Sequence, residues 1–174
     1  MKKTAILLSL LIFLGVGITA AVYTAREVPV TYDGSKTDVM AISWWTYCSN
    51  HPLTVAVCIG TKGYCGDCIE KNGEFTLCLP GNKISEPAFK AGCTSGRNLD
   101  KVKEFGLEMV KADTVAPEYV KESRLVMECR VVNQLAVGDH RMFIAEVQAM
   151  HTDESVRNLM AINGYAALGT VSLD

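Results

Sequence analysis

The sequence predicts a mainly β fold, in which an antiparallel barrel carries helices at its periphery. Stretches typical of strands outnumber helical stretches, and most of them follow one another directly along the chain. Asp33-Gly34 is a strong signal for a hairpin turn between two such stretches. No Gly-x-Gly-x-x-Gly sequence marks a strand-to-helix turn, so a nucleotide site of the Rossmann type is not predicted.

Four strands and one short helix are expected in the first half of the domain. His51-Pro52 breaks the chain before a run rich in β-branched residues, and Pro80-Gly81 stops the fourth strand. The helix is expected at Tyr64–Asn72, with Gly73 as its C-cap. The strands are expected at Glu27–Tyr32, Val39–Trp45, Leu53–Ile59 and Phe75–Leu79.

Two long strands are expected in the second half, at Leu125–Leu135 and Met142–His151, joined across Val137–Arg141. Helices are expected before them at 84–93 and 99–105, the second ending at Gly106. An extended segment at 107–112 and a polar loop at 113–122 complete this half. Beyond Asp153 the sequence predicts no element.

The bulk composition fits one folded domain and excludes an electrostatic nucleic-acid binder. The chain has 174 residues, which is enough for a substantial core. It carries 17 Lys and Arg against 19 Asp and Glu, a net charge of −2 at pH 7. Without a basic excess, we expect no nucleic-acid partner.

The N-terminal segment differs from the rest of the chain. Lys2 and Lys3 precede an uncharged apolar run, 5–21, which is followed by small residues. This order is typical of an export signal or a short membrane anchor, although a buried strand or helix of the domain would give the same pattern. We expect residues 1–25 to be a signal-like or membrane-tethering segment and residues 26–174 to be the domain.

The seven cysteines indicate a different compartment from the N-terminal segment. An odd number leaves at least one without an intrachain disulfide partner, and three of them, Cys58, Cys78 and Cys129, lie within apolar strand patterns. Buried free cysteine behaves as a small hydrophobic residue and suits a reducing compartment. The sequence therefore leaves the localisation open between export or membrane association and the cytoplasm.

A glycine-containing loop, Gly60-Thr61-Lys62-Gly63, leads from a strand into the helix that starts at Tyr64 and Cys65. Backbone amides at a helix start, a hydroxyl and an ammonium together suit a phosphate group. An ordinary strand-to-helix turn with a solvated lysine would give the same sequence.

An apolar stretch, Ala41-Ile42-Ser43-Trp44, offers a flat wall together with a hydroxyl. Indole rings provide large faces against which a planar ligand can pack. A core strand whose tryptophans simply pack against neighbours is the alternative.

A third stretch, Ser95-Gly96-Arg97, leads through a turn to Lys101. Arg97 and Lys101 are expected one turn apart on a helix, where they could hold anionic groups. A capped helix with a basic solvent-exposed face is the alternative.

His140 lies in the turn Gly138-Asp139-His140-Arg141, just before an apolar-alternating strand. The turn places the imidazole, Asp139 and Arg141 at the mouth of the sheet. A structural or solvated histidine is the alternative to a catalytic one.

The order of these four stretches resembles the flavin reductase-like family, whose members bind FMN on an antiparallel split β-barrel of Greek-key type. Asp-Val-Met-Ala-Ile-Ser-Trp at 38–44 is similar to the family's Asn-Val-x-Thr-x-Ser-Trp, with Asp38 in place of Asn and Ala41 in place of Thr. The segment 95–101 is similar to Ser-Gly-x-x-x-Asp-Lys, and Cys65 stands where a Thr is more usual. The likeness covers about 28–154.

The resemblance implies an FMN cofactor, NADH or NADPH as co-substrate, and a homodimer. It implies hydride transfer from nicotinamide to flavin, with His140 as the catalytic residue. The cofactor contacts it implies are Ala41, Ile42, Ser43, Trp44, Thr61, Lys62, Tyr64, Cys65, Ser95, Gly96, Arg97 and Lys101. A non-enzymatic FMN electron carrier that serves a partner protein is the competing function.

Cys65-x-x-Cys68 suggests a third class of protein. It could be a dithiol redox pair near a helix start, or half of a zinc site, and two cysteines without a joint function would give the same spacing. The chain has no second Cys-x-x-Cys to complete a zinc ribbon, so no metal site is predicted.

Overall fold

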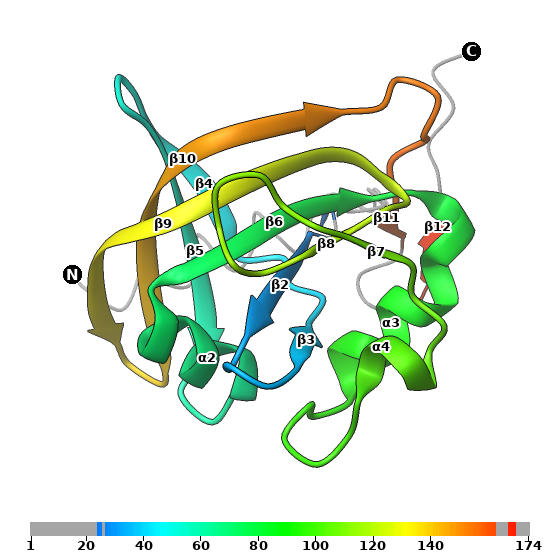
Figure 1. Cartoon of the computed structure of the whole chain (residues 1–174), viewed down its shortest axis with the longest axis horizontal. Helices are drawn as coiled ribbons and strands as arrows, with labels where there is room; N and C mark the ends of the chain where they lie inside the picture. Colours follow the sequence, from blue (N-terminus) through cyan, green and yellow to red (C-terminus); the bar gives the residue numbers. More distant parts are fainter. Residues whose placement is uncertain (1–23, 26, 163–166, 170–174) are drawn as a thin grey trace, which may run out of the picture.

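The computed structural model of this chain describes residues 24–25, 27–162 and 167–169. These residues form a curled antiparallel sheet with helices at its margins (Figure 1). Among these residues, the main sheet has seven strands, and two small sheets flank it. The spatial order of the main sheet is β3 (Thr37–Val39), β2 (Val28–Tyr32), β6 (Glu74–Pro80), β9 (Ser123–Val137), β10 (His140–Thr152), β5 (Leu53–Gly60) and β4 (Trp45–Asn50). The flanking strands are β1 (Thr24–Ala25), β11 (Met160–Ile162) and β12 (Ala167–Gly169) in one sheet, and β7 (Met109–Val110) and β8 (Tyr119–Val120) in the other.

The short connection between the two edge strands forces the sheet to curl. β3 and β4 lie at opposite edges of the sheet, yet only residues 40–44 separate them in sequence. Such a connection spans at most about 20 Å, whereas a flat sheet of seven strands is about 29 Å across. The sheet therefore bends into an antiparallel barrel whose edges approach each other without pairing, so it is not closed.

The prediction of a single strand at Val39–Trp45 is wrong, because the chain crosses there from one edge of the sheet to the other. The strand β3 ends at Val39, β4 begins at Trp45, and the residues between them cross the split. Ile42 exchanges two backbone hydrogen bonds with Glu27, at 2.8 and 3.2 Å, and the Met40 amide donates to Pro29 at 3.2 Å. On the other side, the Cys58 amide donates to the Trp44 carbonyl at 2.8 Å. The crossing is thus fastened to β2 and β5 but belongs to neither ladder.

Turn chemistry fixed several other elements as expected. The helix α2 (Tyr64–Asn72) has the predicted bounds, and Gly73 ends it at φ 70°, donating to Ile69 at 2.7 Å. The hairpin of β2 and β3 forms around Gly34 at φ 99°. The hairpin of β9 and β10 turns at Gly138, with φ 58°, and places His140 opposite Val137.

The remaining differences concern short elements. The helix expected at 99–105 is reduced to α4 (Lys101–Glu104), because the Asp100 carboxylate caps it by accepting from the Lys103 amide at 3.2 Å. The expected polar loop 113–122 contains β8, which pairs with β7 within the expected extended segment. The strands β11 and β12 were not expected, and they are too short to show a period. The 3₁₀ turn η1 (Asn82–Ile84) precedes α3 (Ser85–Cys93).

The structure describes only the last two residues, 24 and 25, of the predicted N-terminal segment 1–25. Residues 1–23 lie outside the described part of the chain. Thr24 and Ala25, which we placed in the separate segment, form β1 and pair with β11. Within the described residues, none of the helices has the length and apolar character needed to cross a bilayer.

The core lies inside the curl of the sheet. Alternate residues of β5, Val55, Val57 and Ile59, are fully buried and meet Phe75 of β6 and Phe143 of β10. A second cluster lies beneath α3, which Figure 1 shows beside α4 at the β3 side of the sheet. Each fully buried large side chain stabilises the fold by about 1.5–3 kcal/mol. The apolar interior thus leaves ligand chemistry to the outer face and the margins.

A buried carboxylate anchors the loop that covers β9. Glu128 is 0% exposed and accepts four hydrogen bonds: from the Asp113 and Thr114 amides at 2.8 and 2.6 Å, the Thr114 hydroxyl at 2.5 Å, and His151 Nε2 at 2.6 Å. Burial alone would raise the pKa of Glu128, but these donors outweigh it and lower the pKa to about 2.

Glu128→Gln should destabilise the fold by about 2–4 kcal/mol at pH 7, because the loop amides lose a charged acceptor in a buried site. Since the folded pKa lies below the unfolded value, the contribution of Glu128 is present above about pH 4.5 and disappears as the pH falls towards 2. Urea unfolding at pH 7 and pH 3 should show a smaller gap between wild type and variant at pH 3. The exposed Glu154→Gln is the matched control, and an equal effect of both changes would contradict the assignment.

Candidate functional site

Two adjoining cavities on one side of the molecule gather most of the predicted site residues. We name them the His140 cavity, of about 200 Å³, and the Lys62 cavity, of about 210 Å³. Met40 lines both, so the crossing segment forms their shared wall. The His140 cavity is lined by Met40, Ala41, Ile42, Ser43, Trp44, Cys58, Gly60 and His140. The Lys62 cavity is lined by Asp38, Met40, Lys62, Gly63, Tyr64, Cys65, Gly92, Cys93, Thr94, Ser95, Gly96 and Lys101.

The imidazole of His140 is held in one orientation. Its Nδ1 lies 2.6 Å from Asp139 Oδ1, and this hydrogen bond lowers the pKa of Asp139. An ionised carboxylate can only accept, so Nδ1 carries the proton and Nε2 is left available in the neutral ring. Trp44 packs against the ring with 4.5 Å between centroids and an interplanar angle of 33°. The indole is 56% exposed, so it forms the outer rim of the cavity.

The crossing segment presents polar groups to the His140 cavity. Ile42 points its amide and carbonyl towards Glu27, and its neighbours Ala41 and Ser43 line the cavity. The Ser43 hydroxyl oxygen is buried and has no hydrogen-bond partner among the described residues. A buried hydroxyl without a partner is costly, which indicates a position that a ligand atom completes.

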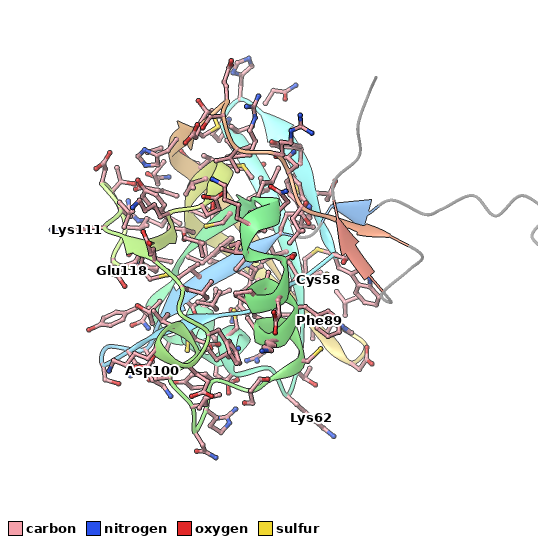
Figure 2. The ribbon with its side chains drawn as sticks, turned by 90° about the vertical axis from the view of Figure 1, so that its right-hand side faces the viewer. Cys58, Lys62, Phe89, Asp100, Lys111 and Glu118 are labelled. Carbon is pink, nitrogen blue, oxygen red and sulfur yellow. The ribbon has the colours of Figure 1, made fainter. Side chains whose placement is uncertain are left out.

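The Lys62 cavity lies at the start of α2. Gly63 is the N-cap residue, and no side chain caps the helix. The Lys62 side chain is exposed and forms no ion pair or hydrogen bond with another described residue. Figure 2 shows it reaching away from the body of the protein on the same side as Cys58 and Phe89. Free helix-end amides and a free ammonium suit an anionic group at this rim.

Tyr64 forms one wall of the Lys62 cavity. Its hydroxyl donates to the Asp33 carboxylate, and burial together with this bond raises the pKa of Tyr64. Lys36 Nζ and Arg97 Cζ each lie 5.2 Å from the centroid of the ring. The cations therefore fix the ring as a wall of the cavity.

Arg141 ties the glycine loop to α2. Its guanidinium pairs with Asp67 at 2.8 Å and Glu70 at 2.7 Å, and it also donates to the carbonyls of Thr61 and Gly63 at 3.3 and 3.2 Å. Gly66 makes room for it, because a Cβ there would lie 2.6 Å from Arg141 Nη2. This contact holds the loop in register with the His140 turn.

Arg97 and Lys101 do not lie one turn apart on a helix as expected, and the alternative of a capped helix with a basic solvent-exposed face is not observed for Lys101 either. Arg97 lies in the turn before α4 and pairs with Asp67 at 2.6 Å. Lys101 is 1% exposed, and its ammonium lies 3.0 Å from Asp38 Oδ1. The sequence predicts solvent exposure for a lysine at the start of a short helix, but the side chain of Lys101 is buried.

Two predicted contacts, Thr61 and Arg97, do not line either cavity. Thr61 acts through its backbone, its amide donating to Asp139 at 2.9 Å. Sequence reasoning missed Met40, Asp38 and Cys58 as lining residues. The strand alternation could have found Cys58, since it lies on the face opposite Val57 and Ile59. Asp38 was noted only as a departure from the family pattern.

The Cys-x-x-Cys pair does not form an accessible redox site. All seven cysteines are free, and Cys65 and Cys68 are 0% and 2% exposed. Burial, together with the charge of Asp38, raises the pKa of the Cys65 thiol, and burial also raises that of Cys68. Both favour the unreactive thiol over the thiolate. Among the described residues, the group with metal-ligand spacing is Asp113, Glu128 and His151, where Glu128 already takes four protein donors.

Comparison with known proteins defines the class. A family profile described as flavin reductase like domain matches residues 17–168. The chain belongs to the flavin reductase-like family. An uncharacterized protein of Archaeoglobus fulgidus is 30% identical over 125 residues, covering 72% of this chain and 71% of that protein.

Solved structures agree with this membership. Flavoredoxin of Desulfovibrio vulgaris (Miyazaki F) superimposes with a TM-score of 0.80 at 26% identity, over 91% of this chain and 93% of that one. The FMN-binding protein of Thermus thermophilus superimposes with a TM-score of 0.78 at 18% identity, over 91% and 92%. The predicted split-barrel fold is confirmed.

Gly96→Ala should destabilise the protein by about 1–3 kcal/mol, because the added Cβ would lie 1.9 Å from Asp38 Oδ1 and the turn must move. The matched control is Gly60→Ala, whose Cβ meets nothing nearer than His140 Nε2 at 4.0 Å. Urea midpoints for the two variants should differ clearly. Equal midpoints would show that the turn does not rest on the Asp38 carboxylate.

Proposed function

We propose that this chain is an FMN-binding oxidoreductase that transfers hydride from NADH or NADPH to flavin. The observation that carries the proposal is the pair of cavities joined at Met40. They bring together eleven of the thirteen residues that the family resemblance implied, from five separate parts of the chain. Their two chemistries, a flat wall with polar edge groups and a rim with a free cation, match the two ends of a flavin mononucleotide.

The His140 cavity fits the ring system. Backbone groups of Ala41 and Ser43 and the buried Ser43 hydroxyl would bond the polar edge of the ring, and the Trp44 indole would shield its border. The Lys62 cavity fits the polyol chain and the phosphate of FMN. Lys62, the α2 amides and Ser95 would surround the phosphate. The bound flavin supplies the hydride-accepting chemistry, and the protein supplies position and hydrogen bonds.

His140 is the proposed catalytic residue. Its Nδ1 is occupied by Asp139, so Nε2 faces the cavity beside Gly60 and Trp44. In this role it orients the nicotinamide or the flavin edge, and it supplies an acceptor there in the neutral form. The Asp139 carboxylate fixes the tautomer.

A second function, a flavin electron carrier that serves a partner protein, is favoured by the structural likeness to a flavoredoxin. Both functions need bound FMN. In the enzyme a nicotinamide, NADH or NADPH, reduces the flavin, whereas in the electron carrier neither nicotinamide does. Steady-state oxidation of either nicotinamide with added free flavin separates them.

Purified protein should show absorption bands near about 375 and 450 nm, as expected of an oxidised flavin. Protein that is purified without cofactor should quench the fluorescence of added FMN at micromolar concentration. A colourless protein that leaves FMN fluorescence unchanged would contradict the proposal.

His140→Ala should lower the rate of flavin reduction by NADH or NADPH about ten-fold or more, while FMN affinity changes by less. Rapid-mixing absorbance at the flavin band measures the rate. The exposed His51→Ala, in the turn between β4 and β5, is the matched control. An unchanged reduction rate would return His140 to a structural role.

We also propose that two copies associate through the C-terminal end of β9, next to the hairpin turn into β10. Residues 132–137 are exposed on both faces of this strand, and they include Val132, Leu135 and Val137. Exposed apolar side chains in one strand are typical of an interaction surface. Sedimentation analysis should give a dimer, which Leu135→Glu dissociates and the exposed Met150→Glu at the other end of the hairpin does not. A monomeric wild-type protein would exclude this interface.

A further inference from the structure

The floor of the Lys62 cavity is a buried ion pair. Asp38 and Lys101 are 2% and 1% exposed, and both line the cavity. Their charged atoms lie 3.0 Å apart. The turn at Gly96 rests on the pair, because a Cβ there would lie 1.9 Å from Asp38 Oδ1 and 3.0 Å from Lys101 Cε. The pair is therefore built into the cavity and does not come from mobile surface side chains.

The ammonium of Lys101 is surrounded by acceptors. Besides its ion pair with Asp38 at 3.0 Å, it donates to the carbonyls of Val39 at 2.5 Å and Ala91 at 3.1 Å. Two carbonyls and one carboxylate oxygen thus surround its three protons. A phosphate would meet this cation only together with the carboxylate that neutralises it.

The carboxylate of Asp38 is less satisfied. Its charge partner is Lys101, and neither of its oxygens accepts a hydrogen bond of normal geometry from the described residues. A buried carboxylate with free acceptor capacity attracts hydroxyl donors and repels anions. The remaining cations near the rim are Arg97, paired with Asp67 at 2.6 Å, and Lys36, bonded to the carbonyls of Gly96 and Arg97. Lys62 remains free.

We propose that Asp38 sets the charge selectivity of the Lys62 cavity. Its carboxylate cancels the charge of Lys101, so the floor accepts the hydroxyl groups of a polyol chain. Lys62 at the rim is then the cation that favours a phosphorylated flavin. The proposal rests on flavin binding at this site and adds the residue that determines how strongly FMN is preferred over riboflavin.

The test measures the ratio of the riboflavin Kd to the FMN Kd by fluorescence quenching at low ionic strength, where charge effects are least screened. Lys62→Ala, a change at an exposed side chain, should lower the ratio about ten-fold or more and leave only the preference that the α2 amides and Ser95 give, because Lys101 adds none of its own. A ratio that stays at the wild-type value would show that the charge of Lys101 is felt, and it would overturn the proposal.

Asp38→Asn removes the carboxylate charge and keeps an oxygen acceptor. It should raise the ratio about ten-fold or more, the effect of one unit charge several ångströms from a phosphate at an effective dielectric constant of about 20–40. Asp100→Asn makes the same charge change at the α4 cap, where Asn caps equally well, and should leave the ratio unchanged. Equal ratios in Asp38→Asn and wild type would reject the assignment.

The double variant Asp38→Asn/Lys101→Met keeps the test decisive if Asp38→Asn alone does not fold. It removes both charges and leaves no buried ion without a partner, a replacement that proteins often tolerate. The wild-type ratio should be preserved, and a ten-fold fall would overturn the proposal. If wild-type protein binds neither flavin, the proposed function fails. Normal binding with a contrary ratio rejects only the role of Asp38.

Discussion

The crossing of residues 40–44 between the two edges of the sheet is the constraint on which the rest of this structure depends. A link this short cannot join the edges of a flat sheet of seven strands, so the sheet must curl. The curl buries the inward residues of β5, β6 and β10 in one core. It also leaves the crossing itself at the surface, hydrogen-bonded to β2 through Met40 and to β5 through Trp44. Both cavities share this segment as a wall, so the split in the barrel is also the place where the candidate site forms.

Charge pairing organises the site around that wall. Arg141 holds the glycine loop against α2, Asp139 holds His140, and the Asp38–Lys101 pair supports the turn at Gly96. Because these charged groups are used to position backbone and side chains, few charges remain for a ligand. Lys62 is free of partners among the described residues, which concentrates the attraction for an anion at the rim. Lysine and arginine side chains that look equally available in the sequence therefore differ, in the folded protein, in whether their charge is free to bind a ligand.

Local signals explain which elements could be predicted. The bounds of α2, its glycine cap, and the hairpin turns at Gly34 and Gly138 depend on residues within a few positions of one another, and their backbone angles required those residues. The single strand predicted at Val39–Trp45 was wrong because an apolar run that crosses between sheet edges looks the same as a buried strand. The strands β11 and β12 have three residues each, which is too few to show an alternation.

The sequence by itself determined the fold class, the hairpins, α2, and the four segments that meet at the candidate site, since these follow from turn chemistry, apolar patterning and the family motifs. Only the tertiary structure decided which side chains in those segments face a ligand. Lys101 and Lys62 are both lysines beside a glycine-containing turn, yet one is 1% exposed and bound to Asp38 and two carbonyls, while the other extends into solvent. The physical reason is that burial and ion pairing depend on partners some 60 residues away along the chain, as for Lys101 and Val39, and no local pattern records them.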